Sequence, residues 1–285
     1  MPGGDLNEGA AQRFIASFET VDDLLWQAVT SRLPKLGLIT LARSGRIGPL
    51  VELAMATAAL PDRYSDVMVE PPAFHQVGRA LRDGAISGAG ARDRAGVFPL
   101  SRVNLDGAET ERLAWEQWAK HAENAAVAAG LTKGLVAGLM GALGELQDNV
   151  FEHSGRPESG IVAYAASEGA FEFVVADAGR GVLASLRENP EFSLLADSGA
   201  ALQVAASDGA SRYARSTGHG YGIGQLFRAL AHEAAELRFR SGDYALRLWG
   251  DAPSLTGQVE LAQKAWLDGL AITVRCAPTA PGRRP

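Results

Sequence analysis

The sequence predicts an α/β protein in two parts, and three observations support this prediction. Strand-like and helix-like patterns alternate in the first hundred residues, which is typical of a small α/β layer. Further on, long helical patterns are followed by paired β-rich runs. The Gly/Ala-rich segment 84–97 lies between them and is predicted to be a linker. We therefore expect an N-terminal α/β module at 1–97, a larger domain at 98–276 and a disordered tail at 277–285.

The elements of the N-terminal module are predicted from apolar spacing and turn residues. Phe14, Phe18 and Leu24 recur at roughly helical spacing, whereas Pro71 and Pro72 end a β-rich run. The predicted order is a helix at 9–33, a strand at 36–42, a helix at 50–60, a strand at 64–70 and a helix at 74–82. This order resembles STAS-type regulatory domains in pattern, although no motif supports the resemblance. We expect a regulatory or interaction module.

The C-terminal domain is predicted to contain helices and hairpins. Glu168-Gly169 and Ser241-Gly-Asp each separate two β-rich runs, which is typical of hairpins. The predicted helices cover 107–129, 132–154, 196–206 and 222–235, and the predicted strands cover 160–167, 170–176, 237–241, 244–249 and 270–276.

Composition narrows the class of function. The net charge of -6 gives no electrostatic footprint for nucleic acid or an acidic membrane surface, so neither is an expected partner. The single cysteine, Cys276, excludes an intramolecular disulfide and a thiolate metal cluster. The N-terminus lacks a signal-peptide pattern, and no apolar run approaches the length of about 20 residues that spans a membrane. We expect a soluble, cytoplasmic protein.

The first of three segments that carry chemistry is the predicted helix around Glu145 and Asn149. These two residues lie four apart and share one helical face, while leucines form the opposite, apolar face. Mg²⁺ prefers oxygen ligands and keeps several waters, so one amide oxygen together with phosphate oxygens suffices to hold it. The alternative is the solvated polar face of an ordinary helix.

The second segment is the end of a buried strand and the turn after it. The strand ends in Asp177, and Gly179 and Gly181 follow at alternate positions. A carboxylate fixed there can accept a hydrogen bond from an exocyclic amine, and the glycines let a flat base lie against the backbone. The alternative is an ordinary Asp-Gly turn.

The third segment is a glycine-rich loop that leads into an amphipathic helix. Gly218, Gly220, Gly222 and Gly224 stand at alternate positions, and such a loop with the N-terminus of the next helix suits phosphate. Ile223 takes the place of the third glycine of a dinucleotide-binding motif, and the absence of any Gly-Lys dipeptide excludes a P-loop. The alternative is a glycine loop without a ligand.

In this order, the three segments resemble the GHKL ATPase superfamily, which includes sensor histidine kinases, anti-sigma-factor serine kinases, gyrase B subunits and mismatch-repair ATPases. The resemblance covers roughly residues 107–276 and rests on Glu-x-x-x-Asn, Asp-x-Gly-x-Gly and Gly-x-Gly-x-Gly. It implies a Bergerat fold, which is a two-layer α/β sandwich with a mixed sheet and helices on one face.

The resemblance also implies a role for each matching residue. Asn149 would ligate the Mg²⁺ that bridges the phosphates of ATP, and Glu145 would polarise the attacking water or hydroxyl. Asp177 would recognise the adenine amino group, with Gly179 and Gly181 under the base. The lid that closes on the phosphates would include Gly218, Gly220, Gly222 and Gly224.

Three functions agree with this pattern. The first is a signalling ATPase or a serine/threonine protein kinase of the anti-sigma type, which hydrolyses ATP or phosphorylates a protein partner. The second is a non-catalytic, ATP-gated switch that changes its affinity for a partner. The third is a histidine kinase core, which the missing acceptor box and membrane span disfavour. Glu145 favours the first over the second, because a pure switch needs no base. The expected partner is a protein, either a regulator or a phosphoacceptor, and a homodimer stays open.

Overall fold

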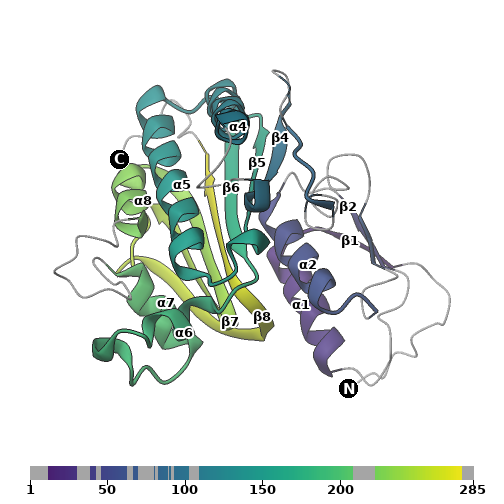
Figure 1. The fold of residues 1–285 in the computed structure, drawn as a ribbon, viewed down its shortest axis with the longest axis vertical. Coiled ribbons are helices and arrows are strands. Elements are labelled where there is room, and N and C mark those ends of the chain that lie inside the picture. The colour runs from purple at the N-terminus through teal and green to yellow at the C-terminus, as the bar shows by residue number, and fades with distance from the viewer. Residues whose placement is uncertain are drawn as a thin grey trace.

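Figure 1 shows the fold of the chain in a computed structural model. The described residues are 12–30, 39–42, 46–62, 67–69, 80, 83–88, 90, 93–102, 109–207 and 222–277.

The centre of the molecule is a five-stranded sheet with the order β4-β5-β6-β8-β7. Its strands are β4 (Ala95–Pro99), β5 (Ile161–Ser167), β6 (Ala170–Asp177), β7 (Ala234–Asp251) and β8 (Gln258–Cys276). Each neighbouring pair is antiparallel, where the resemblance implied a mixed sheet. β6 is buried along its whole length, because both faces of the sheet are covered. The predicted class, an α/β sandwich, is confirmed.

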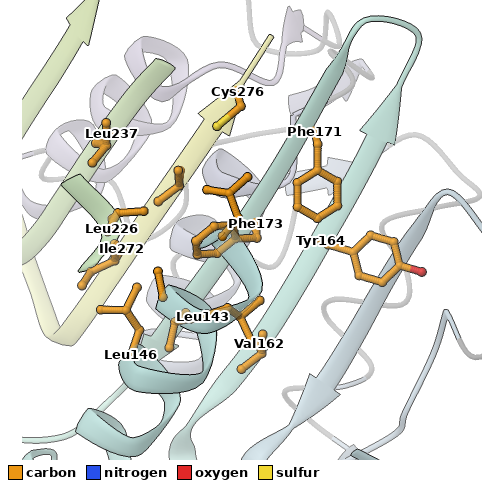
Figure 2. Close-up of a cluster of buried hydrophobic side chains, with 14 of the residues drawn as sticks. Leu143, Leu146, Val162, Tyr164, Phe171, Phe173, Leu226, Leu237, Ile272 and Cys276 are labelled. Atoms are coloured by element: carbon orange, nitrogen blue, oxygen red, sulfur yellow. The ribbon is translucent and has the colours of Figure 1, made fainter. Parts of the chain in front are cut away.

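Three helices cover one face of this sheet (Figure 1). They are α4 (Glu109–Ala128), α5 (Lys133–His153) and α8 (Gly222–Leu230). α5 begins at an N-cap, because the hydroxyl of Thr132 accepts a hydrogen bond from the N–H of Leu135 at 3.3 Å. Figure 2 shows the apolar core beneath α5, where leucines such as Leu143 lie over strand residues such as Phe173. This core fixes the position of α5 against β6.

The opposite face of the sheet is covered by the N-terminal part of the chain, to the right in Figure 1. This part consists of α1 (Phe18–Thr30), α2 (Gly48–Ala59) and a parallel sheet of β1 (Gln12–Ile15), β2 (Ile39–Ala42) and β3 (Val67–Val69) in that order. A second buried apolar cluster joins Leu25 and Val51 of these helices to Val174 and Ala271 of the large sheet. Helices therefore cover both faces of the sheet rather than one.

The remaining elements are short. They are the helices α6 (Gly181–Leu186) and α7 (Ser198–Ala206) and the 3-10 turns η1 (Leu100–Arg102), η2 (Pro157–Ser159) and η3 (Pro190–Phe192). The helix predicted at 196–206 is confirmed as α7. Most of the helix predicted at 74–82 and nearly all of the tail predicted at 277–285 lie outside the described residues. Among the described helices, none is both long and apolar enough to cross a membrane.

The first predicted helix begins too early. Residues 9–33 were expected to be helical, but Gln12–Ile15 forms β1 and α1 begins only at Phe18. β1 pairs with β2 in parallel, a partner that apolar spacing along one segment cannot indicate. The strands predicted at 36–42 and 64–70 are present as β2 and β3.

The linker predicted at 84–97 is wrong at its C-terminal end. Ala95–Pro99 forms β4, and Ser87 makes an isolated bridge with Val97. The glycines that suggested flexibility serve close packing instead, because a Cβ on Gly88 would lie 2.2 Å from the Cα of Gly96. The predicted domain boundary after residue 97 thus falls inside a strand of the large sheet.

The hairpin predicted around Ser241-Gly-Asp is also wrong. β7 runs through this triplet, and its pairing with β8 shifts register on both sides of Gly242, which has φ +58°. The triplet is therefore a β-bulge, and the hairpin turns at 252–257 instead. The helix predicted at 222–235 ends at Leu230, because the chain enters β7 at Ala234.

Candidate functional site

Asp177 lies at the end of β6 with only 4% of its surface exposed. Its Oδ1 accepts a hydrogen bond from the N–H of Gly179 at 2.8 Å. Burial raises the pKa of Asp177 to about 6, and the hydrogen bond from Gly179 opposes this rise. The carboxylate is thus buried at a cost to the folded state.

Asp177 differs from the other buried carboxylates of the described chain. Asp22 and Glu52 both form ion pairs with Arg238, and Glu172 forms one with Arg46. No charged side chain of the described residues contributes to the pKa of Asp177. A buried carboxylate without a cationic partner, at the end of a strand, is a candidate for binding a ligand.

At Gly179, the turn after Asp177 packs closely against the C-terminal end of α5. A Cβ on Gly179 would lie 2.2 Å from the carbonyl oxygen of Ser154, so no other residue fits there. The same carbonyl oxygen accepts a hydrogen bond from the N–H of Arg180 at 2.9 Å. The first two predicted segments are therefore in direct contact.

Gly181 begins α6 with φ +76°, a backbone conformation that favours glycine. A Cβ at this position would lie 2.9 Å from Oγ of Ser241. The N–H of the next residue, Val182, donates a hydrogen bond to the same Oγ at 3.0 Å. Ser241 was missed by sequence reasoning, because it was assigned to a hairpin turn.

Gly269 is a second site residue that sequence reasoning missed. It has φ +75°, and a Cβ there would lie 1.9 Å from the carbonyl oxygen of Asp177 and 2.7 Å from the N–H nitrogen of Gly179. Gly269 immediately precedes Leu270, which pairs with Asp177 in the sheet. A glycine just before the predicted final strand was the available signal.

Glu145 and Asn149 are half-buried on α5. Asn149 stands five residues before Ser154, so about 7.5 Å of helix separates it from the contact with Gly179. Burial and the charges of Glu145 and Glu152 raise the pKa of Asp148, which shows that this side of α5 is acidic. Among the described residues, no group of three or more His, Cys, Asp or Glu could hold a metal ion.

The third predicted segment is described only in part. Gly222 and Gly224 lie in the first turn of α8, whereas Gly218 and Gly220 lie outside the described residues. α8 packs closely on α5, since a Cβ on Gly138 would lie 2.9 Å from the Cβ of Ala229. The helix after the glycine loop is therefore held against the helix that carries Glu145 and Asn149.

Comparison of the chain with protein-family models and with curated proteins finds no match. The function of the site is therefore inferred from its residues and their geometry.

Proposed function

We propose that the protein is a Mg-ATP-binding signalling protein of the GHKL type, which hydrolyses ATP or phosphorylates a protein partner. One observation carries this proposal. Asp177 is a buried carboxylate without a cationic partner among the described residues, and it lies in a glycine turn fastened to α5. Ion pairs with arginines explain the other buried carboxylates of the described chain, but not Asp177.

The chemistry of Asp177 suits the amino group of adenine. Its Oδ1 already accepts a hydrogen bond from the N–H of Gly179, and an ionised carboxylate has further lone pairs that can accept more hydrogen bonds. With a pKa of about 6, the side chain is mostly ionised at pH 7. A donated hydrogen bond from an amine would stabilise this charged form. The side-chain position of Gly179 is occupied by the carbonyl group of Ser154, so the base would approach the turn from another side.

The α5 residues suit the phosphate end of the nucleotide. The acidic side of this helix repels phosphate unless a cation lies between them, which favours binding of ATP together with Mg²⁺. The carboxamide oxygen of Asn149 would be a ligand of the ion, and phosphate oxygens and waters would complete its coordination. An all-protein metal cage is not needed for such a site.

Glu145 would orient and polarise the water or hydroxyl that attacks the γ-phosphoryl group. Phosphoryl transfer is achieved mainly by positioning and charge neutralisation, so one such carboxylate is sufficient. Gly222 and Gly224 at the start of α8, together with Gly218 and Gly220, would belong to the lid over the phosphates.

ATP binding is tested by calorimetric titration of the purified protein with Mg-ATP. The wild type should bind, and Asp177→Asn should weaken binding at least tenfold (about 1.4 kcal/mol), because an amide cannot replace the full acceptor capacity of the carboxylate. Asp23→Asn, the same change on the exposed side of α1, is the matched control and should bind like the wild type. Absence of binding by the wild type would refute the proposal.

Catalysis and the alternative, a non-catalytic ATP-gated switch, are separated by Glu145→Ala. This variant should lose ATP turnover and keep its ATP affinity within a few-fold, because Glu145 is assigned to the reacting water or hydroxyl and not to nucleotide binding. Glu116→Ala on α4 serves as the control. A wild type that binds ATP without turnover, alone or with its partner, would favour the switch, and an equal loss of affinity and turnover in Glu145→Ala would contradict the assigned role.

A further inference from the structure

The interface between the N-terminal helices and the large sheet contains a buried charge cluster. Glu52 of α2 is fully buried and binds Arg238 of β7 through two contacts, Nε to Oε1 at 2.8 Å and Nη2 to Oε2 at 3.0 Å. Asp22 of α1 accepts a third hydrogen bond from Nη2 of the same arginine at 2.6 Å. Such charge-assisted, two-point pairing fixes the position of both helices on the strand.

Arg240 extends this cluster along β7. Its side chain is fully buried, and its Nε lies 3.9 Å from Oε2 of Glu52, the only carboxylate of the described residues that pairs with it. Its Nη2 donates a hydrogen bond to the carbonyl oxygen of Ala265 on β8, whereas Nε and Nη1 have no hydrogen-bond partner in the described chain. Glu52 of α2 therefore contributes most to compensating the charge of Arg240, and Asp22 and Asp243 contribute less.

Ser241, the next residue of β7, belongs to the candidate site. Its hydroxyl accepts a hydrogen bond from the N–H of Val182 at 3.0 Å and donates one to the carbonyl oxygen of Gly269 at 2.6 Å. Val182 follows the second glycine of the turn after Asp177, and Gly269 packs against the backbone of Asp177 itself. One buried hydroxyl thus joins the turn to β8.

We infer that α1 and α2 set the geometry of the nucleotide site through Arg240 and Ser241, so that ATP binding and the docking of these helices are energetically coupled. The inference rests on the proposed function. Its basis is a series of three links. Glu52 pairs with Arg238 and Arg240, the peptide bond joins Arg240 to Ser241, and Ser241 is hydrogen-bonded to the turn after Asp177.

The coupling is reciprocal. If docking of α2 favours the binding geometry of the turn, ATP must favour docking of α2 to the same extent. The N-terminal module is then the element through which a protein partner would raise or lower nucleotide affinity. A partner that draws Glu52 away from the sheet would remove the carboxylate that pairs with Arg240 and disturb Ser241.

Glu52→Gln tests the coupling in the full-length protein. The variant keeps the shape of the side chain but removes its charge, and its dissociation constant for Mg-ATP should rise about tenfold, within the usual range of coupling between sites. Glu19→Gln is the matched control. The Glu19 side chain is 70% exposed, and its carboxylate lies 3.5 Å from Arg247. Because an exposed ion pair contributes little, loss of the Glu19 charge should change the dissociation constant by roughly twofold or less. A folded Glu52→Gln variant with wild-type affinity would overturn the inference.

Hydrogen exchange of the wild type provides a second test that does not require the Glu52→Gln variant to fold. Mg-ATP at a concentration equal to the wild-type dissociation constant should slow exchange of the α2 amides, and the same addition to Asp177→Asn should slow it much less. Unchanged exchange of α1 and α2 in a wild type that binds ATP would overturn the coupling and leave the proposed function standing. A wild type that binds no ATP would instead refute the proposed function, and the inference with it.

Discussion

At the scale of one residue, the burial of Asp177 costs stability. Its carboxylate is buried in the sheet with one backbone hydrogen bond and no cation of the described chain to offset desolvation. Glu52, equally buried, is held by two contacts to Arg238. The difference separates a carboxylate that supports the fold from the one that we propose binds a ligand.

The raised pKa of Asp177 predicts a pH dependence of stability. The folded-state pKa of about 6 lies above the ordinary value of 3.8, so between these values the folded protein binds more protons than the unfolded chain. The contribution of Asp177 to stability is therefore fully present below about pH 4 and is lost as the pH rises through 6. Asp177→Asn removes this dependence, because an amide does not titrate.

Relative to the wild type, Asp177→Asn should gain stability between pH 4 and pH 7, by roughly 2 to 3 kcal/mol at most. Denaturant unfolding of both proteins at several pH values measures this difference. The Asn side chain can still accept the N–H of Gly179, so the turn should persist. A difference that stays constant over this pH range would show that Asp177 is not buried as an unpaired carboxylate.

Sequence reasoning at the residue scale found Asp177, Gly179 and Gly181 but not the charges behind them. Arg238 and Arg240 alternate with apolar residues on β7, a pattern that indicates one polar face and predicts exposure to water. In the structure α1 and α2 cover that face, and both arginines are buried. A strand pattern shows that its two faces differ, but not what covers each of them.

At the scale of elements, local patterns were sufficient wherever the element is defined by its own residues. α5, β5 and β6 lie within a residue or two of their predicted bounds, because helical spacing, the N-cap Thr132 and the turn Glu168-Gly169 are all local signals. The long β7–β8 pair was not found, because Ser-Gly-Asp suits a turn and a bulge equally well. Only the pairing of β7 with β8 distinguishes the two.

At the scale of the whole molecule, the N-terminal module is part of the fold rather than an appendage. Its helices share a buried apolar cluster with Ile161, Val174 and Ala271 of the large sheet. The sheet therefore has two covered faces, and removing the module would expose one of them.

This arrangement predicts that the C-terminal part does not fold properly alone. A fragment of residues 83–285 retains every strand of the large sheet but exposes its second apolar face, which favours aggregation. Size-exclusion chromatography should show aggregates, and thermal unfolding should lack the sharp transition of the full chain. A fragment that elutes as one discrete species and unfolds cooperatively would instead support two independent domains with a boundary near residue 97.

The sequence by itself determined the α/β class, the main helices of the C-terminal part and the residues of the turn after Asp177. These features depend on periodicity, capping and glycine spacing, which act over a few residues. The tertiary structure alone decided that Gly269 and Ser241 contact the turn after Asp177 and that Gly179 packs against Ser154. It also decided that α1 and α2 pair with the buried arginines of β7. Such contacts join residues tens to more than two hundred positions apart. Their energies depend on burial, which exists only once the chain has folded.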